Sequence, residues 1–313
     1  MSITGTYLEN PGQFPDPADG EPWGHQELWI DFAGGPYQVS GLNEPQLELL
    51  RDHFGEACIA PEASDDPAVL IRVLQLPAGH FRIPEEHPRL LDFDLEALEQ
   101  KVKVSGEHLC GSIELTDGIS GCLWTDRDDS WFTRNVFENY FRILVTYRLL
   151  ETGGMLLHSA GIVSGDSAFL FTGRSGDGKS TLSRLSLAEG REVLSDDMNA
   201  VTWRGDIPWI EKVPFTGDLG RSWARSSSHP LGGLFAIRKA PETIIEDLPL
   251  TSTLSLLIVC TPYINADPFR LPQLMENLHK LTQTVPAHIL SFSLSGEIWP
   301  LIEQTITIDG KRD

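Results

Sequence analysis

The sequence has few cysteines, and their spacing matches neither a metal site nor a disulfide framework. The 313 residues include four, Cys58, Cys110, Cys122 and Cys260, which lie far apart and form no C-x-x-C pair. Close pairs of that kind are typical of zinc sites, and small secreted domains that depend on disulfides are dense in cysteine. We therefore expect buried, inert thiols rather than a zinc site or disulfide bonds.

Two further absences limit the class of protein. No run of about 18 apolar residues occurs, and the N-terminus lacks a basic segment followed by an apolar one. The 24 Lys and Arg residues face 45 Asp and Glu, and the net charge of −21 repels nucleic-acid phosphates and anionic lipids. The composition predicts a cytoplasmic protein without a nucleic-acid or membrane partner, and it suits a basic peptide or protein partner.

What is present is the composition of a globular protein. The chain is 41% hydrophobic, shows no internal repeat or low-complexity block, and is long enough for two moderate domains. Residues 1–26 are rich in Pro, Gly and acidic side chains, a composition that buries little apolar surface by itself. We expect this segment to form a flexible, loosely draped arm.

The residues after this arm predict a smaller α+β domain, residues 27–129. Two strand-like segments flank Gly34 and Gly35, which is typical of a β-hairpin, and residues 43–58 have the apolar spacing of an amphipathic helix. Alternating or apolar runs bounded by turn residues predict further strands. These runs are VLIRVLQL, LEQKVKVSG, LCGSIEL and GISGCLWT.

A long helix and a hairpin open the second predicted domain, residues 130–313. Residues 130–150 carry apolar side chains at three- and four-residue steps, and Gly153 and Gly154 follow as a stop signal. The aromatic residues of this helix are interpreted as packing. Two apolar strands, MLLHSAGIV and SAFLFTG, then flank a tight polar turn, so we expect an antiparallel pair.

The motif that organises the chain follows this hairpin. The segment GRSGDGKST, residues 173–181, fits the phosphate-loop pattern G-x-x-x-x-G-K-[ST] between a predicted strand and a predicted helix. The pattern needs glycines so that successive backbone N–H groups can curl around phosphate oxygens. Lys179 is expected to contact the β- and γ-phosphates, and Ser180 to bind Mg²⁺. The alternative is a Gly- and Ser-rich surface turn. The nine nucleotide-binding candidates are Gly173, Arg174, Ser175, Gly176, Asp177, Gly178, Lys179, Ser180 and Thr181.

An acidic pair follows the next predicted strand. Asp196 and Asp197 end REVLSDD, and carboxylates beside a phosphate loop are placed to hold Mg²⁺ or to accept a proton. We expect one of them, with Asp196 as the metal candidate, to bind the cation with Ser180 and the other to act as base; which does which stays open. A turn or helix-cap pair is the alternative.

Other charged residues are secondary candidates. Arg174, and Arg221 and Arg225 in a basic loop, could stabilise charge in a transition state, although surface solvation is the simpler interpretation. Glu211 could reach the metal from the next strand, or be an exposed strand-edge charge. The remaining chain predicts alternating strands and helices, namely AVTW, WIEKVPF, LGGLFAIRK, TSTLSLLIVC, RLPQLMENLHKLTQTV, AHILSFSL and EIWPLIEQTI.

With LLHSAGIV, FLFTGRSGDGKSTL and GREVLSDD in this order, the chain resembles the HPr kinase/phosphorylase family and its looser relatives. The resemblance covers roughly residues 150–215 and extends faintly to the end. It implies an α/β core with the phosphate-loop fold shared with ATP-dependent phosphoenolpyruvate carboxykinase, and ATP- and Mg²⁺-dependent transfer of a phosphoryl group to a serine hydroxyl. It also places His158 where the family has a histidine near the phosphates and the catalytic carboxylate; a core histidine is the alternative.

Two departures from that family concern the acceptor. Thr181 stands where the bifunctional enzymes have an acidic residue, and their Glu-Ile-Arg-Gly signature is missing. These departures argue against phosphorylase activity and against HPr as the acceptor. The leading hypothesis is a kinase for a serine of a peptide, protein or small molecule, with Asp196, Asp197, His158 and Lys179 as catalytic candidates. The alternatives are a nucleotide-binding sensor or scaffold without phosphotransfer and, less favoured, a carboxykinase-like enzyme; a homo-oligomer is possible in each case.

Overall fold

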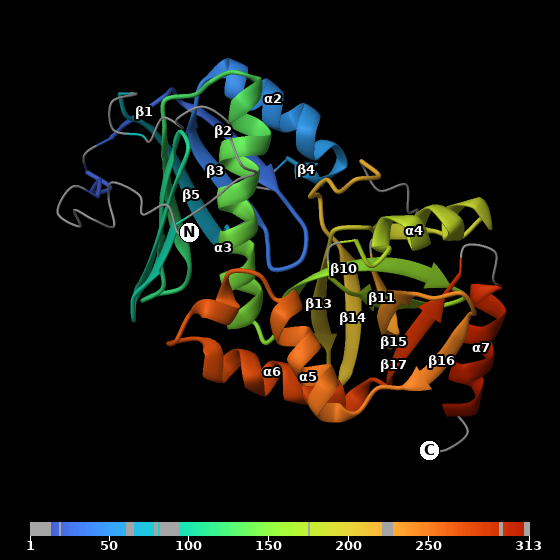
Figure 1. Ribbon diagram of the computed structural model, residues 1–313. Helices are drawn as coiled ribbons and strands as arrows, with labels where there is room; N and C mark the ends of the chain where they lie inside the picture. Colours follow the sequence, from blue (N-terminus) through green and yellow to red (C-terminus); the bar gives the residue numbers. More distant parts are fainter. Residues whose placement is uncertain are drawn as a thin grey trace. The chain divides into compact units, whose positions relative to one another are not determined.

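The computed structural model describes residues 14–18, 20–60, 66–77, 81, 94–174, 176–220, 228–293 and 297–309 (Figure 1). Two compact units make up the chain. The first comprises Met1–Arg148 with Asp267–Phe269, and the second Leu149–Ala266 with Arg270–Asp313. Each unit combines a mixed sheet with helices, so the fold is of the α/β kind. The sequence places its boundary before the long helix, at residue 130, whereas most of that helix lies in the first unit.

In the described part of the first unit, nine strands form one sheet. Their order is β4-β2-β3-β5-β9-β8-β7-β6, and β1 pairs with β5. The strands β3, β5 and β9 are parallel neighbours, while the other pairs are antiparallel. The bounds are β1 Glu21–Pro22, β2 Gln26–Ile30, β3 Tyr37–Leu42, β4 Cys58–Ile59, β5 Val69–Gln75, β6 Asp94–Ala97, β7 Lys101–Gly106, β8 Leu109–Glu114 and β9 Ser120–Thr125.

This sheet contains the predicted hairpin and the four further predicted strands. The hairpin is the antiparallel pair β2 and β3, and the four runs correspond to β5, β7, β8 and β9. The short strands β1, β4 and β6 were not predicted, because two to four residues carry no readable periodicity. Strand β1 lies in the segment whose composition predicts a loose arm, so Glu21 and Pro22 belong to the sheet instead.

Helix α2, Glu44–Phe54, begins at the predicted start, where Asn43 caps it. It ends four residues before the predicted end at Cys58, which belongs to strand β4. The Asn43 side chain accepts a hydrogen bond from the Gln46 N–H at 2.9 Å, and the Gln46 side chain accepts one from the Asn43 N–H at 3.2 Å. This reciprocal arrangement satisfies N–H groups that a helix start otherwise leaves open. The buried face of α2 carries Leu47, Leu50 and Phe54, and the helix packs against β2.

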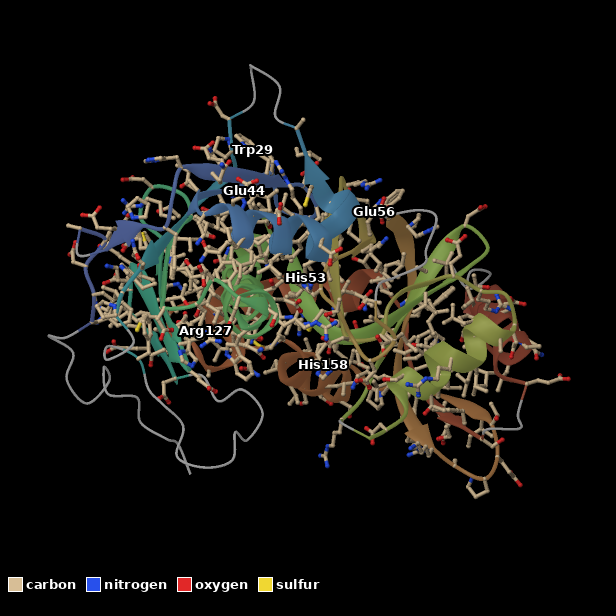
Figure 2. The ribbon with its side chains drawn as sticks, turned by 90° about the horizontal axis from the view of Figure 1, so that it is seen from above. Trp29, Glu44, His53, Glu56, Arg127 and His158 are labelled. Carbon is tan, nitrogen blue, oxygen red and sulfur yellow. The ribbon has the colours of Figure 1, made fainter. Side chains whose placement is uncertain are left out.

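The long predicted helix consists of two parts. A π-helical stretch, Phe132–Phe137, leads into helix α3, Glu138–Glu151, and Gly153 at φ 80° follows it as the predicted stop. Near the junction, Glu138 is buried, contacts the ring of His53 of α2 and forms an ion pair with Arg142 one turn later. Figure 2 labels His53. Helices α2 and α3 are therefore joined by a buried polar cluster as well as by apolar packing.

The aromatic ring of Tyr140 on α3 lies in a groove made by two glycines of the sheet. A Cβ atom at Gly111 on β8 would stand 2.4 Å from the ring, and one at Gly121 on β9 would stand 2.2 Å from the phenolic oxygen. That oxygen donates a hydrogen bond to the Ser112 carbonyl at 2.7 Å. The aromatic residues of this helix thus pack the core of the first unit, as the sequence predicts.

The second unit also has a single sheet, of eight strands among the residues described. Its order is β11-β10-β13-β14-β15-β17-β16, β12 pairs with β10, and β11 also pairs with β15. Strand β15 therefore has two neighbours along one edge: its first residues pair with β14, and its later residues pair with β11. The bounds are β10 Met155–Ser164, β11 Ser167–Thr172, β12 Val193–Ser195, β13 Met198–Arg204, β14 Ile207–Lys212, β15 Ser228–Lys239, β16 Ile244–Asp247 and β17 Ala287–Phe292.

The predicted hairpin before the phosphate-loop motif is confirmed as the antiparallel pair β10 and β11. Strands β11, β15 and β17 are parallel to one another, so their carboxyl ends meet at one edge of the sheet. The strand β16 was not predicted. The α-helices α4 Lys179–Ala188, α5 Leu250–Cys260, α6 Leu271–Thr284 and α7 Ile298–Asp309 accompany this sheet. Figure 1 shows α5 and α6 packed side by side.

The core of the second unit lies between the sheet and helices α4 and α7. It includes Phe171 of β11, Leu182 of α4 and Trp299 of α7, all fully buried or nearly so. The Trp299 ring nitrogen donates to the Ser186 hydroxyl at 2.9 Å, so α7 is bonded directly to α4. Helix α4 is thereby fixed relative to the strand that precedes it, which positions its first turn.

The four cysteines all lie in the described part of the chain and are free thiols. Cys110, Cys122 and Cys260 are buried, as predicted, and Cys58 is partly exposed. Burial raises the pKa of Cys260 above its usual value. A thiol held in its protonated form is a poor nucleophile and metal ligand, which agrees with the prediction of inert cysteines.

The contact between Gly121 and Tyr140 provides a stability test. Replacing Gly121 with Ala should destabilise the protein by about 1–3 kcal/mol, since a methyl group would overlap the phenol. Replacing Tyr140 with Phe removes one buried hydrogen bond and should cost about 1 kcal/mol. In the double variant the added methyl no longer meets the hydroxyl, so urea unfolding followed by tryptophan fluorescence should show less loss than the sum of the two. Additive losses would contradict this packing.

Candidate functional site

The phosphate-loop motif lies between a strand and a helix, as the sequence predicts. Strand β11 ends at Thr172 and helix α4 begins at Lys179. Gly176 has φ 89° and Gly178 has φ 113°, backbone angles that a residue with a Cβ rarely adopts. Gly178 is the N-cap of α4 and offers no side chain to cap the helix, so the first N–H groups of α4 are left for another acceptor.

Lys179 is folded back onto the loop. Its side chain is 8% exposed, and its ammonium group donates to the Gly173 carbonyl at 2.9 Å. A buried ammonium group requires such an acceptor. The charge of Lys179 is therefore held within the loop, at the end where the helix dipole is also positive.

The Asp177 carboxylate accepts a hydrogen bond from one of the backbone N–H groups of the loop. The Arg174 N–H donates to the Asp177 carboxylate at 2.6 Å, and the Asp177 N–H donates to the Arg174 carbonyl at 3.2 Å. These two bonds close a tight turn within the loop. They also place a negative charge where the motif is expected to receive a phosphate.

Asp196 is the most buried acidic group of the candidate site. It is 4% exposed and lies in the bend after β12. Its Oδ1 atom accepts a bond from the Leu219 N–H at 3.4 Å, whereas Oδ2 is buried and has no hydrogen-bond partner among the described residues. Burial raises the pKa of the Asp196 carboxyl, the nearby charges of Asp218 and Asp197 raise it further, and bonds from Leu219 and Ser180 lower it.

Asp218 is a site residue that the sequence interpretation missed. The Ser180 hydroxyl, in the first turn of α4, donates to the Asp218 carboxylate at 3.0 Å. Asp218 lies in a tight turn closed by the bond from the Gly220 N–H to the Gly217 carbonyl at 3.1 Å. The signal in the sequence was a carboxylate between two glycines, in Gly217-Asp218-Leu219-Gly220, but no motif links that turn to the phosphate loop.

Gly217 allows this turn to approach the acidic pair. A Cβ at Gly217 would lie 2.2 Å from Asp196 Oδ1 and 2.8 Å from the Cβ of Asp197. Any larger residue there would push the turn away. The absence of a side chain at this position therefore brings Asp218 and Asp196 to the same hydroxyl, that of Ser180.

Asp197 and His158 form a separate pair beside this cluster. The His158 Nε2 atom lies 3.3 Å from Asp197 Oδ1, and the two side chains are 44% and 25% exposed. Figure 2 labels His158. Strand β10 carries His158, and the Ser159 N–H bonds to the Asp197 carbonyl at 3.0 Å, which fixes the pair. His158 is thus a partly exposed neighbour of a carboxylate rather than a buried core histidine.

The donor set at Ser180 suits a hard cation such as Mg²⁺. Mg²⁺ takes oxygen ligands and is held in many phosphate sites by one or two carboxylates together with substrate phosphates. The unpartnered Asp196 Oδ2 is an orphaned acceptor of this kind, and Ser180 and Asp218 contribute further oxygens. Among the residues described, no group of three or more His, Cys, Asp or Glu side chains has the geometry of a complete protein metal site. The residues therefore fit a cation that takes its remaining ligands from a substrate or water.

The other predicted residues have different surroundings. Glu211 on β14 accepts a bond from the Thr202 hydroxyl at 2.6 Å and lies 3.7 Å from Arg204, so its contacts lie along the sheet. The prediction that Glu211 reaches the metal finds no support in these contacts. Arg174 is exposed and Thr181 is half-buried in the first turn of α4. Ser175, Arg221 and Arg225 lie outside the described residues.

The fold and the site together define a mixed α/β protein whose glycine-rich loop, helix N-terminus and carboxylate cluster meet at one sheet edge. The family model described as "SynChlorMet cassette protein ScmC" matches residues 135–307. Since this is more than half of the chain, the protein belongs to the ScmC family. No curated protein matches it.

Similarity to solved structures is distant. An HPr(Ser) kinase/phosphatase from Coxiella burnetii is 14% identical with a TM-score of 0.30, over 50% of this chain and 90% of that chain. A likeness at this TM-score does not establish a shared fold. In the part of the chain described, no helix is long and apolar enough to cross a membrane.

The burial of Asp196 predicts that its charged carboxylate lowers the stability of the protein at neutral pH. The pKa of Asp196 in the folded state is raised above the usual value of 3.8, which applies to the unfolded state. Between the unfolded-state and folded-state pKa values, the folded state therefore binds more protons than the unfolded state. The free energy of unfolding therefore falls as pH rises through that interval and stays lowered above it. Asp196→Asn should raise the melting temperature at neutral pH in metal-free buffer and flatten this pH dependence. A lower melting temperature for Asp196→Asn would contradict an unfavourable buried charge.

The negative charge of Asp177 predicts an effect on anion binding. Asp177→Asn keeps an oxygen that can accept the Arg174 N–H and removes the charge, so the turn should persist. Pyrophosphate should then bind about two- to fivefold more tightly, as expected for one partly exposed charge pair. Isothermal titration would measure this, with Asp166→Asn, in the β10–β11 turn, as a control of equal charge change. Equal gains in both variants would indicate only the lower net charge.

Proposed function

We propose that the protein is an ATP- and Mg²⁺-dependent kinase that transfers the γ-phosphoryl group to a serine hydroxyl of a peptide, protein or small-molecule acceptor. The observation that carries the proposal is the buried, unpartnered Asp196 Oδ2 beside Ser180, at the start of the helix that follows the phosphate-loop motif. A carboxylate in that position costs stability, and a site for a cation gives it a use.

The loop and α4 would bind the phosphates of ATP. The uncapped N–H groups at the start of α4 and the loop backbone are suited to phosphate oxygens. Lys179 would exchange its bond to the Gly173 carbonyl for one to a phosphate. The resemblance of this segment to HPr kinase/phosphorylase supports the same assignment.

The surroundings of the acidic pair favour one division of roles. Asp196, with Ser180 and Asp218, would hold Mg²⁺. Both carboxylates lie beside the Ser180 hydroxyl, and the Oδ2 atom of Asp196 has no hydrogen-bond partner among the described residues. When bound, the cation would neutralise charge on the phosphate oxygens. Asp197 is more exposed and already paired with an imidazole, so it is suited to reach an incoming acceptor.

The chemical step then needs a base and an in-line arrangement. Asp197 would take the proton of the acceptor hydroxyl as its oxygen forms a bond to the γ-phosphorus. The bond between that phosphorus and the β–γ bridging oxygen breaks, and ADP leaves with the electron pair. His158, 3.3 Å from Asp197, would orient the carboxylate and tune its basicity.

A transfer assay tests this proposal. The protein would be mixed with labelled ATP, Mg²⁺ and a panel of serine-containing peptides, proteins and small molecules. Asp197→Asn should lower transfer by about 10²- to 10⁴-fold, the usual contribution of a general base, while ADP binding stays unchanged. Lys179→Ala should lose both transfer and tight ADP binding, and Glu211→Gln, which removes a carboxylate from the adjacent sheet, should behave like wild type.

The same assay distinguishes the proposed kinase from the main alternative, a nucleotide-binding protein without phosphotransfer. If wild type binds ADP but is as inert as Lys179→Ala across a broad panel, the chain is better described as a nucleotide-binding sensor or scaffold. If Asp197→Asn transfers phosphate like wild type, Asp197 is not the base.

A further inference from the structure

Lys239 lies beside the phosphate-loop motif without belonging to it. It is the last residue of β15, which runs parallel to β11, so both strands end at the same sheet edge. Its Cε atom stands 3.3 Å from the position that a Cβ at Gly178 would take. The aliphatic stem of Lys239 thus covers the residue that caps α4, and the lack of a side chain at Gly178 permits this approach.

The neighbouring Arg238 shows the contrast between the two faces of β15. Arg238 donates to the Ser291 hydroxyl at 2.6 Å and forms an ion pair with Glu246 at 2.8 Å. Successive side chains of a strand point to opposite faces, so Lys239 lies on the other side, with the loop. Lys239 is exposed, and no carboxylate of the described residues pairs with it.

The helix dipole of α4 does not attract this cation. The first turn of a helix is the positive end of its dipole, so a cation there is repelled rather than attracted. Lys179 already places one ammonium group at this end of α4. The Asp177 carboxylate lies in the same loop, and a polyphosphate bound at this end of α4 would meet both ammonium groups.

We propose that Lys239 is a second phosphate-binding cation, which contacts the nucleoside diphosphate part of the nucleotide from the β15 side of the loop. The proposal rests on the proposed nucleotide site. It assigns to Lys239 a role that the motif does not include, since the motif specifies only Lys179. The stem packed on Gly178 limits where the ammonium group can go, which reduces the entropy lost on binding.

Two variants with the same charge change test the proposal. Lys239→Met keeps an unbranched stem over Gly178 and removes the ammonium group, and Arg238→Met removes the adjacent positive charge on the opposite face. By isothermal titration with ADP in the presence of Mg²⁺, Lys239→Met should bind about five- to tenfold more weakly, the range for one charge-assisted hydrogen bond at a partly exposed site. Arg238→Met should bind like wild type, and Lys239→Arg should retain most of the affinity.

Thermal unfolding gives a second measurement on the same proteins. Without nucleotide, Lys239→Met should melt at or slightly above the wild-type temperature, because a cation near the helix N-terminus has been removed. The rise in melting temperature on adding ADP should be smaller than for wild type. Equal ADP affinity of Lys239→Met and wild type, or equal losses in both methionine variants, would overturn the role of Lys239 and leave the kinase proposal standing. Failure of wild type to bind ADP would overturn both.

Discussion

The close approach of the turn at Gly217 to the acidic pair is the constraint on which the candidate site depends. Asp196 directly follows β12 and is buried. A buried carboxylate needs hydrogen-bond partners or a raised pKa. The turn supplies one partner, the Leu219 N–H, and brings Asp218 to the Ser180 hydroxyl. Because a Cβ at Gly217 would overlap Asp196, this arrangement depends on a glycine that lies outside every recognisable motif.

The parallel pairing of β11, β15 and β17 has an equally direct effect on the site. Parallel strands present their carboxyl ends at one edge, where loops and helix starts gather. The phosphate-loop motif follows β11 and Lys239 ends β15. Phe292 ends β17, and its ring lies only 2.9 Å from the position that a Cβ on Gly178 would take. Residues more than a hundred positions apart in the chain are therefore brought to the same turn of α4 by strand register alone.

The sequence predicts the features of this structure that neighbouring residues decide, and it fails for those that depend on residues distant in the chain. Local signals succeeded: the start of the amphipathic helix near residue 43, the hairpin before the loop and the strand–loop–helix arrangement at Gly178 each rest on a few adjacent residues. The two-residue strand β1 failed, because its pairing with β5 is decided by a distant partner and leaves no periodicity. The mixed α/β class was predictable for the same local reasons, whereas strand order was not.

The candidate site divides in the same way. Lys179, Ser180 and the acidic pair could be named from spacing within a short segment. Asp218 and Lys239 could not, because each reaches the loop through a turn or a strand end whose position is set by tertiary packing. For Glu211 the sequence left two interpretations open, a metal ligand or a strand-edge charge, and its contacts with Thr202 and Arg204 agree with the second.

The balance of charge around α4 completes the physical picture. Asp177 and Asp196 lie beside the loop together with Asp218, while Lys179 is the motif's cation. A polyphosphate approaching this set alone would meet repulsion from the carboxylates, in a protein whose net charge is already −21. A divalent cation at Asp196, as proposed, would make the local charge more positive, and Lys239 would add to that effect. Under the proposed function, the acidic groups would make phosphate binding depend on the cation, so that each of the two ligands would strengthen the binding of the other.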